Sequence, residues 1–153
     1  MASKKELQVS AIENGTVIDH IPADKLFDVI NVLCIDKIQN NAMTFGTNLK
    51  SNQQGKKAIV KIWDKFLEDG EVNKLALVAP EAKINIIKDY EVVEKKLVQV
   101  PDNVDGIVKC MNPKCVTNYE YVPTKFTVVN KSPIVLRCRY CEKMTDQQNF
   151  VII

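Results

Sequence analysis

The chain has 153 residues, of which 46% are hydrophobic and 26% are charged, and its formal net charge at pH 7 is +2. These values are typical of one ordinary globular domain or two small ones. No apolar run approaches the roughly 18 residues of a membrane-spanning helix, and the small net charge gives no sign of the basic face of a nucleic-acid-binding protein. We therefore expect neither a membrane nor a nucleic acid as partner.

Strands and two amphipathic helices are predicted in the first hundred residues. Alternating apolar residues indicate extended structure at residues 7–11 and 16–18, on either side of a turn at Asn14 and Gly15. Pro22 is expected to open a helix, whose apolar face holds residues 26, 29, 30, 33 and 34. The same spacing at residues 59, 62, 63, 66 and 67 predicts a second helix after Gly55. Further strands are expected at residues 43–49, 74–78, 83–87 and 90–93.

This order of elements predicts an α+β fold, in which an N-terminal sheet carries two helices on one face in a ferredoxin-like arrangement. Proline, glycine and short polar residues at 101–106 indicate a boundary. We expect one domain at residues 1–100 and a small antiparallel β domain, like a zinc ribbon, at residues 101–153. The strands of this second domain are predicted at 124–130, 134–137 and 149–153, with a turn at 131–133.

Four cysteines in the second domain form two close pairs. Four residues separate Cys110 from Cys115, two separate Cys138 from Cys141, and twenty-two lie between the pairs. Four thiolates delivered by two tight turns are typical of a closed tetrahedral zinc site, which leaves no position for water or substrate and is therefore structural. Two disulfides or four buried thiols are the alternatives. Disulfides fit poorly, because the polar start of the chain resembles no signal peptide.

One structural Zn²⁺ per chain and a cytoplasmic location are therefore expected. Residues 1–100 carry fourteen lysines and fourteen acidic residues, whereas residues 101–153 carry seven basic and five acidic residues. Four thiolates on one zinc ion would cancel the excess of positive charge in the second domain. A zinc-ribbon factor that binds nucleic acid stays the alternative function, and a basic stripe would distinguish it.

The first domain offers little for catalysis. His20 follows Asp19, which is compatible with half of a catalytic triad, but a hydrogen-bonded structural histidine before a helix is the plainer interpretation. Lys56, Lys57 and Lys61 fall in the first turns of the second predicted helix, where cations oppose the helix dipole. These lysines indicate either a solvated helix face or an anion site for a phosphate. In the second case Lys95 and Lys96 would add a cationic wall, and Asp19 and His20 would contact a ribose or base.

Three stretches resemble the regulatory subunit of aspartate carbamoyltransferase, over essentially the whole chain. The first comprises residues 7–12 and the motif GTVIDHIP at residues 15–22, and the second comprises residues 75–77, 79–80 and 85–93. The third is the cysteine framework, which ends in CRYCEK at residues 138–143. The resemblance is specific, because other zinc ribbons lack the first half of this pattern.

The resemblance implies a non-catalytic, allosteric chain in pyrimidine biosynthesis. In that family the amino-terminal domain binds nucleotide effectors, with CTP and UTP as inhibitors and ATP as activator, and the zinc domain docks on the catalytic chain. Two regulatory chains pair through their amino-terminal sheets, and three such dimers join two catalytic trimers into a dodecamer. The segment 101–106 would then be the joint between the domains.

The resemblance also implies a nucleotide site, carried over position by position. The first three of its residues surround the base, Asp19 and His20 meet ribose and phosphate groups, and the lysines face the phosphates. The implied residues are Ala11, Ile12, Val17, Asp19, His20, Lys57, Lys61, Asn85, Ile87, Tyr90, Val92 and Lys95.

Two departures from the family pattern concern charge. Glu6 stands where the well-studied enteric member has a lysine that helps to bind a second nucleotide, and a carboxylate there repels triphosphates. At the expected interface with the catalytic chain, Asn112, Glu142 and Lys143 match the family, whereas Lys114 replaces an asparagine. Docking on a catalytic trimer is therefore expected to be retained, with altered polar contacts.

Overall fold

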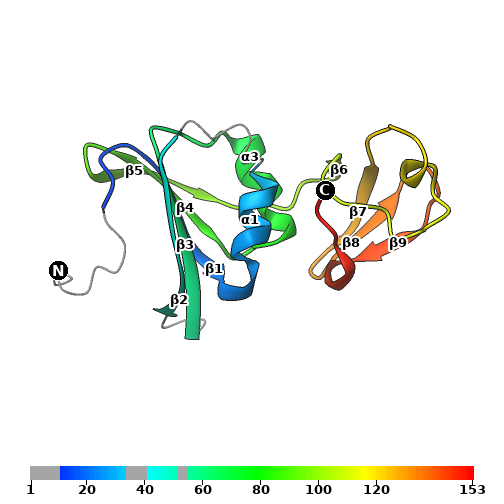
Figure 1. Cartoon of the computed structure of the whole chain (residues 1–153), viewed down its shortest axis with the longest axis horizontal. Helices are drawn as coiled ribbons and strands as arrows, with labels where there is room; N and C mark the ends of the chain where they lie inside the picture. Colours follow the sequence, from blue (N-terminus) through cyan, green and yellow to red (C-terminus); the bar gives the residue numbers. More distant parts are fainter. Residues whose placement is uncertain (1–10, 34–40, 52–54) are drawn as a thin grey trace. The chain divides into compact units, whose positions relative to one another are not determined.

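A computed structural model describes residues 11–33, 41–51 and 55–153. The chain divides into two compact units between Gln99 and Val100, and each unit has its own antiparallel sheet (Figure 1). The predicted strand residues Leu7 and Val9, the predicted core residue Cys34 and the departure at Glu6 lie outside the described residues. None of the described helices is both long and apolar enough to cross a membrane.

The first unit is a five-stranded sheet with its helices on one face. Its elements are β1 (Gly15–Pro22), α1 (Leu26–Val32), β2 (Met43–Ser51), β3 (Gly55–Trp63), α3 (Asp69–Lys74), β4 (Lys83–Lys88) and β5 (Glu91–Leu97). The strand order is β2-β3-β1-β4-β5. The first four strands with the two helices follow the β-α-β-β-α-β order of ferredoxin-like folds, and β5 adds an edge. Figure 1 shows α1 and α3 on the same side of the sheet, as predicted.

The core lies between the sheet and these helices. Ile18 pairs with Val60 on β3 and with Ile84 on β4, and all three side chains are fully buried. Leu26 and Val29 of α1 are buried as well. Because side chains alternate along a strand, the neighbours of these core residues in the strands point to the opposite face. None of the described helices covers that face, which is called the open face below (Figure 1).

The second helix predicted from the apolar spacing at residues 59–67 is wrong, because residues 55–63 form β3. Ala58, Val60 and Ile62 are fully buried, which is a period of two. Isoleucine and valine are β-branched and favour strands. This preference and the alternation together outweigh the helical spacing of the five apolar residues at 59–67. The lysines at 56, 57 and 61 therefore lie on a strand, and the argument from an opposed helix dipole does not apply.

The strand predicted at residues 74–78 is also wrong. This segment contains the end of α3 and a 3₁₀ turn at Leu75–Leu77, both against the core. A short, continuous apolar run does not distinguish a buried strand from a buried helix. The start of α3 carries the better signal, since Glu68 and Glu71 form a reciprocal capping box.

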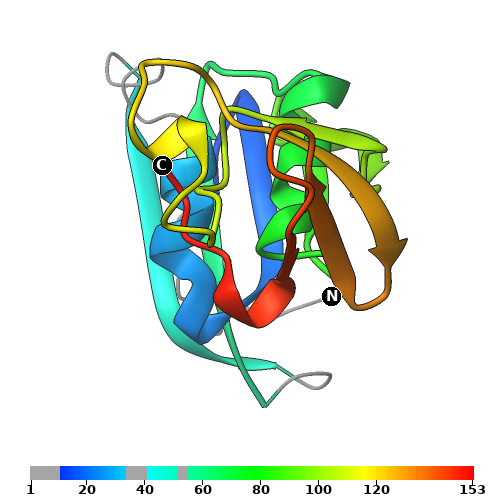
Figure 2. The same cartoon turned by 90° about the vertical axis from the view of Figure 1, so that its right-hand side faces the viewer.

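The second unit is a four-stranded sheet in the order β6-β7-β8-β9. Its strands are β6 (Asn103–Asp105), β7 (Lys125–Lys131), β8 (Ile134–Cys138) and β9 (Met144–Asp146), and β7 and β8 form the predicted hairpin (Figure 2). The strand predicted at 149–153 is wrong, because residues 147–149 form a 3₁₀ turn and Ile152 makes only an isolated bridge with Val108.

The predicted joint at residues 101–106 also needs correction. Residues 103–105 are β6, and Val104 is buried in the core of the second unit. The connection outside helices and strands is therefore residues 98–102. Phe126, Ile134 and Leu136 complete this small core.

Candidate functional site

The four cysteines of the second unit form one compact cluster. Their sulfur atoms all lie within 4.8 Å of one another. Cys110 Sγ is 3.6 Å from Cys141 Sγ, and Cys115 Sγ is 3.7 Å from Cys138 Sγ. A tetrahedron with Zn–S bonds of about 2.3 Å has edges of about 3.8 Å, whereas a disulfide requires about 2.05 Å. The spacing fits a metal and excludes disulfides between these pairs.

Two tight turns present the cysteines from the sequence C-x4-C and C-x2-C. In the first turn the Cys115 N–H donates to the Asn112 carbonyl at 3.0 Å, and the Asn118 amide donates to the same carbonyl at 2.8 Å. In the second turn the Glu142 N–H donates to the Cys138 carbonyl at 2.9 Å. Glu142 has φ of 64°, which lets the chain reverse after Cys141. The backbone thus orients all four thiols toward one point.

The thiols of this cluster differ in acidity. Burial raises the pKa of Cys110 to about 12. At Cys141 burial also raises the pKa, but hydrogen bonds from the Asn112 side chain and the Lys143 backbone outweigh it and lower the pKa to about 7. Zinc binds thiolates, so ion binding must release protons from the buried members of the cluster.

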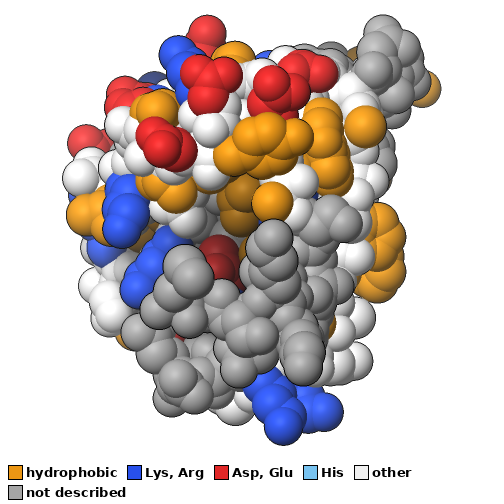
Figure 3. Space-filling model, turned by 90° about the vertical axis from the view of Figure 1, so that its left-hand side faces the viewer, with side chains coloured by type: hydrophobic (Ala, Val, Ile, Leu, Met, Phe, Trp, Pro, Cys, Tyr) orange, Lys and Arg blue, Asp and Glu red, His pale blue; other side chains and the backbone are white. Residues whose placement is uncertain are grey.

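A second group of polar residues crosses the open face of the first unit in one row. Lys61 of β3 and Asn85 of β4 both pair with Val17 of β1, and Asn85 pairs with Lys95 of β5. Residues that are paired across strands share a face. Viewed from the side away from the helices, this face shows lysine side chains beside apolar ones and a recessed acidic group (Figure 3).

Asp19 is the centre of the contacts in this group. The β1–β3 register shifts between Ile18 and Ile21, and His20 has φ of 60°, so a β-bulge re-aims the chain here. Lys57 Nζ lies 2.9 Å from Asp19 Oδ1, and His20 Nδ1 lies 3.7 Å from Asp19 Oδ2. The His20 N–H also donates to Asp19 Oδ1 at 2.7 Å.

Lys61 is the buried lysine of this face. Only 8% of the residue is exposed. Burial lowers the pKa of its ammonium, and the nearby charge of Asp19 opposes that shift. Lysine is rarely buried to this extent, so Lys61 differs from an ordinary solvated lysine on a sheet surface.

A cavity of about 470 Å³ opens beside this row. Five of the residues implied for the nucleotide site line it, namely Asp19, His20, Asn85, Val92 and Lys95. Three more implied residues lie next to this lining. Lys57 contacts Asp19, and Val17 and Lys61 are paired with each other on the neighbouring strands β1 and β3. The lining does not include the remaining implied residues, Ala11, Ile12, Ile87 and Tyr90.

Those four residues lie around the start of β1 and the β4–β5 hairpin. The Tyr90 N–H donates to the Glu13 carbonyl at 2.9 Å, which joins the hairpin to the segment before β1. Tyr90 is 66% exposed, whereas Ile12 and Ile87 are buried. Ile87 pairs with Gly15 and with Val92, so it lies close to one end of the cavity wall.

The structure adds Lys83 to the cationic residues of the open face. Lys83 pairs with Asp19 and lines the cavity together with Lys96 and Leu97. A signal for Lys83 was present in the sequence, because it stands two residues before Asn85 in a predicted strand and therefore shares its face.

Four residues implied for docking on the catalytic chain surround the cysteine turns. Lys114, Glu142 and Lys143 are exposed, whereas Asn112 is half-buried. Asn112 Oδ1 accepts a hydrogen bond from the Lys114 N–H at 3.1 Å, and the Lys143 carbonyl accepts one from the Cys138 N–H at 2.9 Å. Asn112 and Lys143 therefore stabilise the two cysteine turns, independently of any contact with a catalytic chain.

Comparisons with known proteins agree along the whole chain. The family model described as aspartate carbamoyltransferase regulatory chain, allosteric domain, matches residues 7–99, and that described as its metal binding domain matches residues 102–151. Aspartate carbamoyltransferase regulatory chains from Bacteroides thetaiotaomicron and Pyrococcus horikoshii are each 52% identical to this chain. The alignments cover 99% and 95% of this chain, and 98% and 97% of those relatives. The regulatory chain from Thermococcus sibiricus is 50% identical over 97% of both chains.

These matches decide between the open alternatives. The metal-binding family model and the cluster of four cysteines fit one structural zinc ion. The relatives are named as regulatory chains, so neither the Asp-His enzyme nor the nucleic-acid-binding factor is retained. The chain belongs to the aspartate carbamoyltransferase regulatory chain family, and is a non-catalytic subunit with an allosteric domain and with catalytic chains as partners.

Proposed function

We propose that the open face of the first unit binds the nucleotide effectors CTP, UTP and ATP, the first two as inhibitors and the third as an activator. The observation that carries this proposal is the position of Lys61, a largely buried cation on the same face as Lys57, Lys83 and Lys95. Asp19 is the acidic residue that lines the adjoining cavity. Such an excess of positive charge around a cavity suits a triphosphate.

The base and ribose of the nucleotide would bind beside these lysines, against residues of β1, β4 and β5. Asn85 offers both a donor and an acceptor to a base or ribose, and it lines the cavity with Asp19 and His20. Val17 and Val92 offer apolar contact, and the segment at Ala11 and Ile12 lies next to the hairpin that carries Ile87 and Tyr90. Backbone groups of these strands would read the base. CTP and ATP have opposite effects only if their affinities for the two quaternary states differ in opposite directions.

The zinc unit is proposed to dock on the catalytic chain through its cysteine turns. Asn112, Lys114, Glu142 and Lys143 supply polar contacts there. Apolar side chains that are exposed beside the turns, such as Met111 and Tyr140, support an interface at this place. Two regulatory chains would pair through their amino-terminal sheets, and three such dimers would join two catalytic trimers into a dodecamer. The reduced thiols of the zinc site suit the cytoplasm.

Calorimetric titration of the full, zinc-loaded chain with CTP and with ATP tests the nucleotide site. Lys57 and Lys56 provide a matched pair, because they are neighbours on β3 and point to opposite faces. Lys57 contacts Asp19, whereas Lys56 lines a different cavity with Pro22 and Glu81. Both nucleotides should compete for one site, and Lys57→Ala should weaken binding roughly ten-fold or more, with Lys56→Ala within about two-fold of the wild type.

Two results would contradict the proposal. The first is the absence of binding by either nucleotide. The second is an equal loss of affinity in Lys57→Ala and Lys56→Ala, because a diffuse attraction between a basic protein and an anion would then explain the binding.

A further inference from the structure

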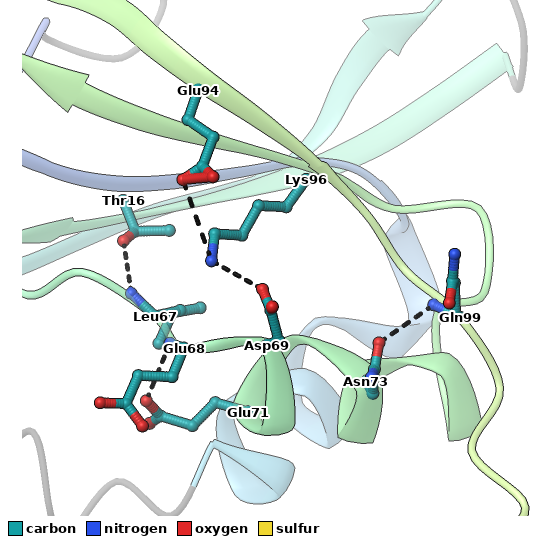
Figure 4. A network of polar contacts seen from close by, with 9 residues as sticks. All are labelled: Thr16, Leu67, Glu68, Asp69, Glu71, Asn73, Glu94, Lys96 and Gln99. Carbon is teal, nitrogen blue, oxygen red and sulfur yellow. Dashed lines mark hydrogen bonds and ion pairs between the residues drawn. The ribbon is translucent and has the colours of Figure 1, made fainter.

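The edge strand β5 presents different residues on its two faces. Val92, Lys95 and Leu97 line the cavity of the open face. Glu94 and Lys96 point the other way, toward α3 (Figure 4). Among the described strands β5 is hydrogen-bonded only to β4, so it is an edge strand of the first sheet, and side-chain contacts add to the restraint from that one pairing.

Lys96 is the main link from β5 to α3. Its Nζ lies 2.8 Å from Asp69 Oδ1 and 3.9 Å from Glu94 Oε2. The Lys96 side chain is 17% exposed, although that of Asp69 is 87% exposed. The hydrogen bond to Asp69 raises the pKa of Lys96, so the ammonium stays charged at neutral pH. Lys96 is also one of the residues that line the cavity, so the ion pair holds a residue of the cavity wall to α3.

A second link lies one helical turn further along α3. Asn73 Oδ1 accepts a hydrogen bond from the Gln99 N–H at 3.3 Å. Asp69 and Asn73 are four residues apart, so they share one face of the helix. Gln99 is the last residue of the first unit, and residues 98–102 form the connection to the second unit outside helices and strands. The two links thus restrain β5 at Lys96 and the chain where it leaves the first unit.

The helix itself is held firmly to the central strand. The Thr16 hydroxyl of β1 donates to the Lys65 carbonyl at 2.6 Å and accepts from the Leu67 N–H at 3.2 Å. Thr16 is fully buried, as are Val72 and Leu75. The Glu68–Glu71 capping box closes the first turn of α3. The helix is therefore well placed to support the edge strand β5.

We propose that the Lys96–Asp69 ion pair and the Asn73–Gln99 hydrogen bond form one clamp, which fixes the cavity wall and the exit of the chain from the first unit to α3. Lys96, Asp69 and Asn73 are positioning residues. A ligand that displaces β5 must strain or release this clamp, and the connection to the second unit moves with it. The choice of CTP as a probe rests on the proposed function, whereas the clamp does not.

Amide hydrogen exchange of the full, zinc-loaded chain tests the clamp without any nucleotide. Lys96→Met and Asp69→Asn each remove one charge of the pair, and the double exchange Lys96→Asp with Asp69→Lys restores an ion pair. Lys65→Met is the matched control, since Lys65 Nζ pairs with Glu71 Oε2 of the same helix at 3.5 Å and makes no link to β5. An exposed ion pair contributes modestly. We therefore expect the amides of β5 and of Gln99 to exchange about two- to five-fold faster in each single variant.

The double variant should return the exchange rates toward those of the wild type, and Lys65→Met should leave them unchanged. The clamp is refuted if Gln99 exchanges at the same rate in Lys96→Met and in the wild type. It is also refuted if Lys65→Met has the same effect as Lys96→Met, because loss of helix stability would then explain both.

CTP titration of the same variants separates the clamp from direct contact with the ligand. If Lys96 held a phosphate directly, Asp69→Asn would release its ammonium and increase CTP affinity, in contrast to Lys96→Met. The clamp predicts that both variants change the response in the same direction, with the effect of CTP on a reconstituted holoenzyme reduced about two- to five-fold. A wild-type chain that binds no CTP refutes the proposed function alone, and the exchange rates then decide on the clamp.

Discussion

Replacement of Lys61 by methionine is expected to stabilise the empty chain and to weaken nucleotide binding. Burial lowers the pKa of Lys61 below its ordinary value of 10.5, although the charge of Asp19 opposes the shift. A lysine whose pKa is lower in the folded chain binds its proton more tightly in the unfolded chain. Its charge therefore reduces the free energy of unfolding at neutral pH, and this loss disappears as the pH rises toward 10.5.

The size of both effects follows from the surroundings of Lys61. Methionine keeps the apolar stem and removes the charge, and Asp19 keeps Lys57 as a partner at 2.9 Å. Removal of one charge destabilises a fold when it leaves the opposite charge buried and uncompensated. Asp19 is not left so, because Lys57 still pairs with it, and we therefore expect a gain of about 1 kcal/mol from relief of the desolvation of Lys61. Loss of a charged contact with a phosphate costs roughly 1.5–3 kcal/mol, which weakens binding roughly 10- to 150-fold.

Urea unfolding measures the stability, and calorimetry with CTP measures the affinity. The chain has one tryptophan, Trp63 at the end of β3, so its fluorescence reports the first unit alone. Lys56→Met is the control, because it removes a lysine from the other face of the same strand. The reasoning is refuted if Lys61→Met is less stable than the wild type by more than about 0.5 kcal/mol and still binds CTP with unchanged affinity.

Three further predictions concern the metal, the pH and the backbone. Cys115→Ser removes one of the four zinc ligands, so we expect loss of co-elution with catalytic chains in size-exclusion chromatography. Calorimetry should show a CTP affinity of the first unit within about two-fold of the wild type. Intact co-elution would contradict a structural metal. A bound anion raises the lowered pKa of Lys61, so CTP affinity measured from pH 7 to pH 10 should fall as the pH passes the pKa of Lys61 in the folded chain. The fall should be smaller in Lys61→Met. An equal dependence of CTP affinity on pH in both proteins would count against contact with Lys61. Gly15 has φ of 146° and a Cβ there would overlap the Ile62 carbonyl, so Gly15→Ala should lower the free energy of unfolding by at least about 2 kcal/mol in urea.

The helical face at residues 26–33 and the strands at 43–49 and 83–87 could be predicted, because one period dominates each segment. The strand at residues 55–63 could not, because apolar residues 59, 62, 63, 66 and 67 match a helical period while Ala58, Val60 and Ile62 match a period of two. Only the pairing with β1 and β2 decides between them, since it places β3 inside the sheet with its alternating set facing the core. Such long-range pairing is not contained in any local window.

The metal site could be predicted almost completely, because its ligands come from two short turns of recognisable spacing. The open face could be predicted only in part. Asp19 and Lys57 are far apart in the sequence, and their contact depends on the bulge between Ile18 and Ile21. Lys83 lies opposite Asp19 through the unbroken register between β1 and β4. A bulge shifts the register by one residue, and nothing in the sequence around His20 indicates where that shift occurs.

The burial of Lys61 supports the proposal that the open face binds an anionic ligand. An exposed sheet face keeps its lysines extended into water, where each costs the fold almost nothing. On this face Lys61 is 8% exposed, and burial lowers the pKa of its ammonium. The nearby charge of Asp19 opposes this shift, and Asp19 also contacts Lys57 and the His20 backbone. An anionic ligand would add negative charge beside this ammonium, so nucleotide binding would stabilise the charged form of Lys61.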